Sequence, residues 1–393
     1  MRILTIPESL TQKYEWMTRV LTGRDGTEQR VALRTIPRQI LAVSHLADSE
    51  ESIQSWKYQF ITELDDVWSL PLWAEAESVT ATSGGATATG DFSLMDDTLV
   101  VPLQILIMAP DGETYETATV ATKNDTTITI TGTWTSSYPE GSVLVPIMYA
   151  YVDNNSGYTP SAVNVATVTI QAVAFNNTEI TARGAVALTT YNSRNVLDRT
   201  YSPGGSELFS QKLERLDFGH KIAVDSDQVY GNITSGRSYI SRGRDDRQWW
   251  KLFLNTVRGQ QKSFYSSTQR HDMTVTTQPA ASGTTFQVRD DATVAGGWEN
   301  ISSHLHIALE MADGATLYKE IDPGTTVDAG GGVHTIGVTV AFPPAGGGPD
   351  PSTPHTIVKV SFLELVRLAS DTVEIEHMHE HRVVKLTVRT IIE

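Results

Sequence analysis

The sequence contains no cysteine. Disulfide bonds, thiol nucleophiles and cysteine-based metal sites are therefore all excluded. Positive charge is also scarce, since 30 Lys and Arg face 46 Asp and Glu, which gives a net charge of -16. Phosphate binding depends on Lys and Arg, so an acidic chain of this kind is unsuited to coating nucleic acid, and we expect no specific nucleic-acid binding.

Long apolar runs are missing as well. The longest, VLVPIMYAYV at Val143–Val152, is about half of what a membrane-spanning helix requires. The N-terminal stretch MRILTIPESLTQ lacks the apolar segment of a secretory signal. We therefore expect a soluble chain with no membrane span and no classical export signal.

Two stretches of the chain repeat one pattern. They read MAPDGETYE at Met108–Glu116 and MADGATLYKE at Met311–Glu320. In each, an apolar run ends at Asp-Gly and a second run restarts at or near a Tyr, which is a strong signal for a β-hairpin. At 393 residues the chain is long enough for more than one core, so the repetition indicates that similar modules occur in both halves.

One amphipathic helix is predicted in each half by apolar residues at spacings of three and four. The first follows an Asp48-x-x-Glu51 capping-box pattern and the second follows Asp245-x-x-Gln248. Their apolar positions are Ile53, Trp56, Phe60 and Leu64 in the first helix, and Trp250, Phe253, Leu254 and Val257 in the second. Both helices carry a Trp-Lys pair, and the text after each is rich in Thr, Ser, Gly and Val, which is typical of short antiparallel strands.

The same order of elements in both halves predicts an internal duplication. We expect a mainly β fold with a helix in each half, in which a β-barrel or sandwich unit is duplicated and each copy carries a small inserted β-barrel. The predicted ranges are 1–76 with 146–175 for the first unit, 77–145 for the first insert, 176–206 for a linker, 207–270 with 356–393 for the second unit, and 271–355 for the second insert.

Two stretches resemble tail-tip proteins of tailed bacteriophages, of the distal-tail or baseplate-hub type. In WMTRVLTGRDGTEQRVALRTIPRQI (Trp16–Ile40), an aromatic residue precedes a Gly-Thr-Glu-x-Arg turn and an Arg-x-x-Pro-Arg segment leading into a strand. In DDRQWWKLFLNTVRGQQKSFYSSTQRHDM (Asp245–Met273), a helix ends in Arg-Gly-x-x-x-x-Phe before the chain enters a β insert. Many distal tail proteins carry one ring-forming unit per chain, whereas this chain has two predicted units.

The resemblance implies a structural virion protein, made in the host bacterial cytoplasm, that forms a ring at the distal end of the tail tube. Its partners would be further copies of itself, the tail tube protein, and hub, spike or fibre proteins. Because a heterologous contact is repeated until a ring closes, two units per chain allow a homo-trimer with pseudo-sixfold symmetry or a homo-hexamer in two layers. A carbohydrate- or receptor-binding β module at the host-contact end of the tail is the alternative.

The clearest candidate for a metal site is EIEHMHEHRVV, in which His377, His379 and His381 alternate. If the segment is one strand, the three imidazoles share a face, but the outer two are then about 13 Å apart, so one zinc ion takes only two neighbours. A solvated or interfacial strand edge is therefore the preferred interpretation. Trp249 is a candidate for a boundary between modules or subunits, because only Trp250 fits the apolar stripe of its helix.

Nothing in the sequence assembles a catalytic site. The acidic pairs Asp65-Asp66, Asp96-Asp97 and Asp290-Asp291 suit solvated turns better than a glycosidase cleft. The first insert offers only Tyr115, Trp134 and Tyr138 as aromatic platforms for a sugar, which favours a scaffold over a lectin. We expect no catalytic, cofactor-binding or metal-binding residues and no enzymatic activity.

Overall fold

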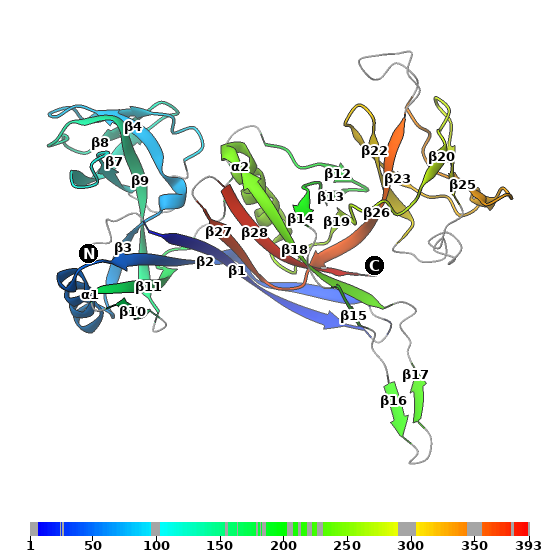
Figure 1. The fold of residues 1–393 in the computed structure, drawn as a ribbon, viewed down its shortest axis with the longest axis horizontal. Helices are drawn as coiled ribbons and strands as arrows, with labels where there is room; N and C mark the ends of the chain where they lie inside the picture. Colours follow the sequence, from blue (N-terminus) through cyan, green and yellow to red (C-terminus); the bar gives the residue numbers. More distant parts are fainter. Residues whose placement is uncertain are drawn as a thin grey trace.

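The computed structural model describes residues 7–393 apart from residues 24, 26, 96–102, 154–155, 163, 178–179, 181, 183–185, 203–206, 211–213, 218–221, 226–230, 290–303, 344–355, 379–380 and 392–393. Strands make up 57% of the described residues and helices 10%, so the mainly β class predicted from the sequence is confirmed. Two α-helices lie within the described residues, one in each half. Figure 1 shows an elongated molecule with a β-rich body at each end and a twisted sheet between them.

A continuous antiparallel sheet runs through the middle of the molecule. Its strands follow in the order β15–β18–β28–β27–β1–β2–β11–β10. Their bounds are β1 (Ser9–Thr22), β2 (Glu28–Ala47), β10 (Gly157–Ala162), β11 (Val165–Ala174), β15 (Glu207–Ser210), β18 (Asn232–Arg242), β27 (Thr372–His377) and β28 (His381–Thr390). Burial alternates along β11, as expected for a strand with one face on a core. The pairing of β1 with β27 joins the two halves of the chain.

Helix α1 (Glu50–Thr62) follows β2, and it begins later than the capping pattern predicts. Its N-cap is Ser49, whose Oγ accepts a hydrogen bond from the Ser52 amide at 3.2 Å. The predicted Asp48-x-x-Glu51 box is therefore wrong, because the extended Ser49 places its own hydroxyl over the first turn. Leu64 lies beyond the C-terminal end of the helix.

Helix α2 (Gly243–Val257) follows β18, and it begins earlier than predicted. The N-cap is Arg242, which makes no side-chain cap, and its amide donates to the Asp246 carboxylate at 3.2 Å. Asp245 and Gln248 consequently lie inside the helix rather than around its N-cap. The helix ends at Val257, and its C-cap is Arg258, whose φ of 55° is left-handed.

The first insert is a closed six-stranded barrel. Neighbouring strands pair in the circle β4–β5–β8–β7–β6–β9–β4. The bounds are β4 (Glu77–Ala81), β5 (Thr87–Gly90), β6 (Gln104–Met108), β7 (Tyr115–Lys123), β8 (Thr127–Ile130) and β9 (Tyr138–Val152). The predicted hairpin at Asp111-Gly112 connects β6 to β7, where Gly112 has a φ of 71°. A separate apolar core that includes Phe92, Ile107 and Trp134 fills the barrel.

The second insert has its own apolar core, which includes Phe286, Leu309 and Phe342. Its strands pair in the order β20–β21–β25–β24, and β22 pairs with β23 and β26. The bounds are β20 (Val275–Thr277), β21 (Thr285–Arg289), β22 (His306–Met311), β23 (Thr316–Glu320), β24 (Val327–Asp328), β25 (Val333–Gly337) and β26 (Ile357–Leu368). The predicted Asp313-Gly314 hairpin joins β22 to β23.

The remaining elements connect these parts. Strands β9 and β26 extend from the inserts into the main body, which is the central sheet with its helices. There β9 pairs with β3 and β11. Strand β26 pairs with β19 and β28. The described part of 176–206 carries three short strands rather than a plain linker, and β13 pairs in parallel with β19. The bounds are β3 (Val67–Pro71), η1 (Trp73–Glu75), β12 (Thr190–Tyr191), β13 (Arg194–Leu197), β14 (Tyr201–Ser202), β16 (Glu214–Asp217), β17 (Ile222–Asp225) and β19 (Phe264–Ser267).

Neither helix of the described residues is long and apolar enough to cross a membrane.

Candidate assembly surfaces and polar cavity

Strand β1 connects the two halves by pairing with both of them. One of its edges pairs with β2, and the other pairs with β27 in a register that runs from Leu10 opposite His377 to Glu15 opposite Thr372. Lys13 lies opposite Glu374, and the two side chains form an ion pair of 3.3 Å. The main-chain ladder thus continues from the first half into the second without a break.

The side chains of β1 complete the core beneath α2. Tyr14 and Trp16 are 5% and 1% exposed, and both belong to the cluster that contains Trp250 and Phe253 of α2. Trp16 is also anchored through its amide, which donates to the Asp371 carbonyl at 3.0 Å. A strand of the first half therefore supplies large aromatic side chains to the core of the second half.

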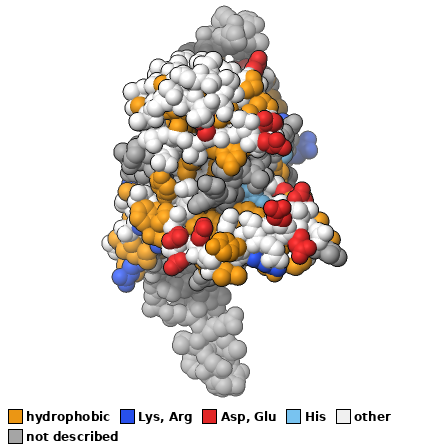
Figure 2. Space-filling view, turned by 90° about the vertical axis from the view of Figure 1, so that its left-hand side faces the viewer, with side chains coloured by type: hydrophobic (Ala, Val, Ile, Leu, Met, Phe, Trp, Pro, Cys, Tyr) orange, Lys and Arg blue, Asp and Glu red, His pale blue; other side chains and the backbone are white. Residues whose placement is uncertain are grey.

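Helix α1 is much less covered than α2. No residue of α1 is buried, whereas eight residues of α2 are. Trp56 and Phe60 stack in a row with His45 and Trp68, at centroid distances of 5.8 to 6.1 Å, yet both remain only partly buried. Figure 2 views this end of the molecule, where hydrophobic side chains lie among acidic ones. Exposed members include Tyr58 at 65% and Ile61 at 83%.

The central sheet ends in two strand edges that face no other strand of the described chain. Within the described residues, β10 pairs only with β11 and β15 pairs only with β18. The β15 edge carries Leu208 and Phe209, which are 63% and 74% exposed. Open edges with apolar side chains favour pairing with a further strand. Figure 1 shows the two edges at opposite sides of the sheet.

A buried charge cluster fastens α2 to the base of the first barrel. Glu75 of η1 forms ion pairs with Lys251 at 2.7 Å and with Arg247 at 3.3 Å, and all three side chains are at most 7% exposed. Burial alone would raise the pKa of Glu75, but Lys251 and Arg247 outweigh it and hold the pKa below its ordinary value. The charge cluster also includes Glu77, which forms an ion pair with Arg244 at 2.6 Å. Burial raises the pKa of Glu77 to about 7, although Arg244 and Arg247 oppose the shift.

The predicted histidine strand does not exist as one strand. Strand β27 ends at His377 and β28 begins at His381, and the Met378 amide donates to the His381 carbonyl in the turn between them. His379 lies outside the described residues. A run of charged and polar residues does not distinguish a connection between two antiparallel strands from one exposed strand.

His377 lies in the junction between the halves. Its Nε2 is 3.2 Å from the Gln12 amide oxygen, and Arg382 donates to its Nδ1 at 3.2 Å. Burial, together with the charge of Arg382, lowers the pKa of His377 to about 3, so the ring is neutral at ordinary pH. No group of three or more acidic or histidine side chains within the described residues has the arrangement of a metal site.

Trp249 is buried at 4% exposure beside Trp250 at 2%, so both face protein. The ring of Trp249 stacks on Phe253, and the Arg199 guanidinium lies 4.5 Å above it. Arg199 belongs to the segment that joins the halves. The boundary position proposed for Trp249 is therefore found within the chain, between α2 and residues 176–206.

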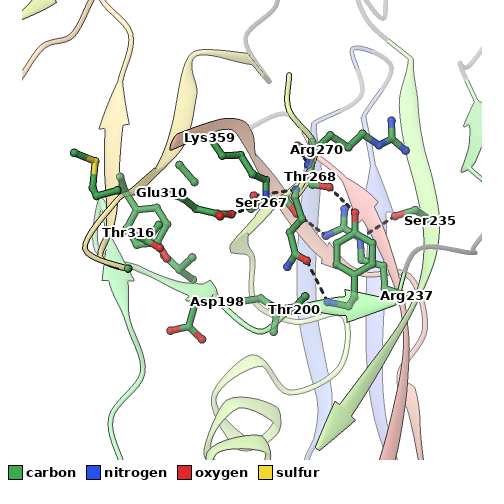
Figure 3. Close-up of a pocket in the computed structure, with 18 of the residues that line it drawn as sticks. Asp198, Thr200, Ser235, Arg237, Ser267, Thr268, Arg270, Glu310, Thr316 and Lys359 are labelled. Carbon is green, nitrogen blue, oxygen red and sulfur yellow. Dashed lines mark hydrogen bonds and ion pairs between the residues drawn. The ribbon is translucent and has the colours of Figure 1, made fainter. Parts of the chain in front are cut away.

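A polar cavity of about 600 Å³ lies between the second insert and the main body. Figure 3 shows Glu310, Thr316 and Lys359 on the insert side and Ser235 and Arg237 on the other. No sequence pattern predicts this cavity, although part of its lining belongs to the Met311–Glu320 hairpin, because the remaining residues come from separate strands that carry no common motif.

The lining charges other than Asp198 form ion pairs within the chain, and the Asp198 carboxylate accepts a hydrogen bond from the Thr189 hydroxyl. Lys359 donates to Glu310 at 2.5 Å, and Arg270 pairs with Glu207. Arg237, at 6% exposure, lies 3.4 Å from the Glu364 carboxylate. Since five of the six ionic groups of the lining form ion pairs and Asp198 accepts from a hydroxyl, much of the remaining hydrogen-bonding capacity of the lining lies in hydroxyl and amide groups. Such a lining suits a neutral polar ligand better than an ion.

One hydroxyl group and one side-chain amide group of the cavity lining are held in place by backbone carbonyls. The Tyr201 hydroxyl donates to the Thr268 carbonyl at 2.6 Å, and the Gln269 amide donates to the Arg199 carbonyl at 2.7 Å. Burial raises the pKa of Tyr201 above its ordinary value, so the hydroxyl stays protonated and able to donate.

The other predicted candidates do not converge on a site. Asp65 and Asp66 lie in the loop between α1 and β3, and the pairs at 96–97 and 290–291 fall outside the described residues. Trp134 and Tyr138 are each 1% exposed inside the first barrel, and only Tyr115 of the three aromatics reaches the surface. These aromatics therefore form no sugar-binding platform, because the barrel interior needs their volume.

No protein-family model matches the chain, and no curated protein matches it either. Any proposal about function therefore rests on the contacts within the chain itself.

Proposed function

We propose that this chain is a structural protein of a phage tail tip, without enzymatic activity, whose copies form a ring at the distal end of the tail tube. The observation that carries the proposal is the central sheet. Each half contributes four strands to it, and each half leaves its outermost strand open at one end of the sheet. A sheet whose two ends are both open extends by adding further copies, and closure into a ring removes the exposed edges.

The order of strand pairing supports an internal duplication. The first half runs β1–β2–β11–β10, and the second runs β15–β18–β28–β27. In each half the helix follows the second strand of this order, and the insert lies between β3 and β9 or between β19 and β26. These two strands pair with each other in both cases.

The inserts support the duplication as well. The first barrel closes in the circle β4–β5–β8–β7–β6–β9. In the second insert the same circle reads β20–β21–β25–β23–β22–β26, where two contacts are single bridges, Ile321 with Val338 and Met273 with Val360. The two inserts thus share one circular order of strands.

A chain with two equivalent units can form a pseudo-sixfold ring from three copies, which would fit a sixfold tail tube to a threefold tip. A hexamer with two stacked layers is the other arrangement. In either ring the partners are the tail tube protein on one side and the hub, spike or fibre proteins on the other. The Asp-Gly hairpins of the inserts lie toward the periphery, and the net acidic charge lets DNA pass without binding.

The mass of the purified protein tests the ring directly. Light scattering is expected to give three or six chain masses, and electron microscopy of tailed particles is expected to place the protein at the tail tip. A monomer at all concentrations, together with its absence from the tail, would refute the proposal.

The polar cavity favours a second function, the binding of a carbohydrate or receptor group. Its volume of about 600 Å³ falls in the range of small-molecule sites, and its hydroxyl and amide lining matches sugar hydroxyls. Calorimetric titration with oligosaccharides of the host surface tests this function. Binding that is weakened by Gln269→Ala would support it, and the absence of heat for all such ligands would exclude it.

A further inference from the structure

We infer that β15 of one copy pairs with the open edge of β10 in the next copy, with Leu208 opposite Gly157, in the register by which β1 pairs with β27 inside the chain. This inference rests on the proposed ring and specifies the contact that closes it. The occupant of each edge is therefore a second copy of the same chain. The register follows from matching the two halves through their observed strand pairs.

The helices provide the first point of correspondence. Trp56 in α1 and Trp250 in α2 each precede a lysine. Ile40 in β2 precedes Trp56 by the same number of residues as Thr234 in β18 precedes Trp250. These two strands occupy the same place in the two halves, directly before the helix.

The partners of these residues relate β15 to β1. Ile40 lies opposite Lys13 in the β1–β2 pair. Thr234 lies opposite Leu208 in the β15–β18 pair. Leu208 therefore takes the place of Lys13.

The same correspondence relates the closing strands of the two halves. Counting back from the helices also matches Ala47 at the end of β2 with Ser241 near the end of β18. Ala47 lies opposite Ala166 of β11, and Ser241 lies opposite Arg382 of β28. Ala166 and Arg382 are therefore equivalent positions.

Equal steps from that point along β11 and β28 reach Thr169 and Lys385. Thr169 lies opposite Gly157 of β10, and Lys385 lies opposite Glu374 of β27. Gly157 therefore takes the place of Glu374. Because Lys13 is opposite Glu374 within the chain, Leu208 is expected opposite Gly157 between copies.

The cores of the two halves support this contact independently. In the same correspondence Phe209 takes the place of Tyr14, which is buried in the core beneath α2. Phe209 is 74% exposed in the single chain, and Trp56 and Phe60 of α1 are only partly buried. Pairing of β15 with the next copy brings Phe209 to the core beneath α1, which then gains the kind of aromatic side chain that the core beneath α2 already has.

The residues of the β10 edge are compatible with the test and with an added strand. Nothing lies within 4 Å of a Cβ built on Gly157, so a cysteine side chain fits there. The β10 edge contains Pro160, a residue that sheets tolerate at edges. The expected pairing therefore centres on Gly157 and Tyr158 rather than on the proline. Tyr158 takes the place of Ile375, which is 7% exposed in the chain.

Paired cysteines test the register, because the native chain has no cysteine to compete. Directly opposite residues of an antiparallel pair have Cα atoms about 4.5 to 5.5 Å apart, within the range that a disulfide bridges. The variant with Leu208→Cys and Gly157→Cys is expected to form disulfides between copies under mild oxidation. Non-reducing electrophoresis should show a ladder that stops at the ring number.

Two matched variants control the experiment. Lys13→Cys with Glu374→Cys occupies the equivalent positions inside one chain, so it should form a disulfide within the monomer at any dilution. Leu208→Cys with Thr159→Cys shifts the partner along the same face of β10 and should cross-link at least about 10-fold more slowly, since its Cα atoms are about 7 Å or more apart.

The outcomes separate this inference from the proposed ring. A ring by light scattering whose Leu208–Gly157 variant fails to cross-link, or cross-links no faster than the Thr159 variant, overturns the register and leaves the ring standing. A monomer without cross-links overturns both. Phe209→Ser provides a second measurement, because a buried aromatic contact predicts at least about 10-fold weaker association with unchanged circular dichroism. Unchanged association would contradict the burial of Phe209.

Discussion

The buried pair between Glu28 and Arg367 offers a sharp test of how the long β1–β2 hairpin is held to the second half. Arg367 donates from Nε to Glu28 Oε2 at 2.6 Å and from Nη2 to Oε1 at 2.9 Å. The two side chains are 4% and 3% exposed. Glu28→Gln keeps the shape of the side chain but leaves the Arg367 charge without its buried counter-ion, so the expected loss of stability is about 3 to 5 kcal/mol.

Urea unfolding followed by tryptophan fluorescence measures this loss, because Trp16, Trp249 and Trp250 lie in the adjoining core. The matched control is Glu374→Gln. Its ion pair with Lys13 also joins the two halves, but the side chains are 36% and 31% exposed. An exposed pair contributes about 0 to 1 kcal/mol, so the control should shift the midpoint only slightly.

The pH dependence of the same variant gives an independent check. Burial alone would raise the pKa of Glu28, but the hydrogen bond and charge of Arg367 outweigh it and hold the pKa below its ordinary value. A depressed folded-state pKa contributes stability above the unfolded value of 4.5, and this stability is lost as the pH falls through the folded-state pKa. Glu28→Gln should therefore flatten the acid limb below pH 4.5. Equal, small losses for both variants would refute the assigned role of the buried pair.

Three further outcomes are expected from thermal unfolding. Burial raises the pKa of Glu77 to about 7, so the stability that Glu77 contributes is present below pH 4.5 and is lost as the pH rises through about 7. Glu77→Gln should therefore reduce the slope of Tm against pH in that window, and an unchanged slope would contradict the shift. Burial lowers the pKa of His377 to about 3, so the stability that its neutral ring contributes is present above pH 6.5 and declines as the pH falls toward 3. His377→Gln should weaken this decline of Tm, and a steeper decline would argue against a neutral buried ring. Gly112→Ala should reduce the stability by about 1 kcal/mol, because Gly112 has a φ of 71°. Gly236 has open space around its Cβ position and no positive φ, so Gly236→Ala should not show this backbone penalty. Equal losses for the two variants would exclude strain as the cause.

Local patterns predicted the types of elements well. The Asp-Gly signals at Asp111 and Asp313 mark hairpins in the structure, because a turn with positive φ depends on the residues that form it. The apolar spacing around Trp56 and Trp250 predicted both helices, although the caps differ by a few residues. Helix boundaries depend on which side chain reaches the free amides, and several neighbouring residues at each start were able to do so.

Long-range contacts were beyond the reach of these patterns. The sequence suggested one strand through His377 and His381, whereas the chain turns between them and buries His377 beside Gln12. The sequence did not predict the cavity at Arg237 and Glu310, because its lining residues meet only after distant strands pair. A lone arginine or glutamate has no local signal that distinguishes a buried pair from a solvated side chain.

The sequence by itself determined the mainly β composition, the two helices, the Asp-Gly turns and the absence of disulfides, since each follows from local propensity or from the residues present. Only the tertiary structure decided that β1 pairs with β27, that Tyr14 and Trp16 complete the core beneath α2, and that β10 and β15 are left open. Strand partners are chosen by burial and by hydrogen bonding across the whole sheet, so two edges with similar local patterns can end in different environments.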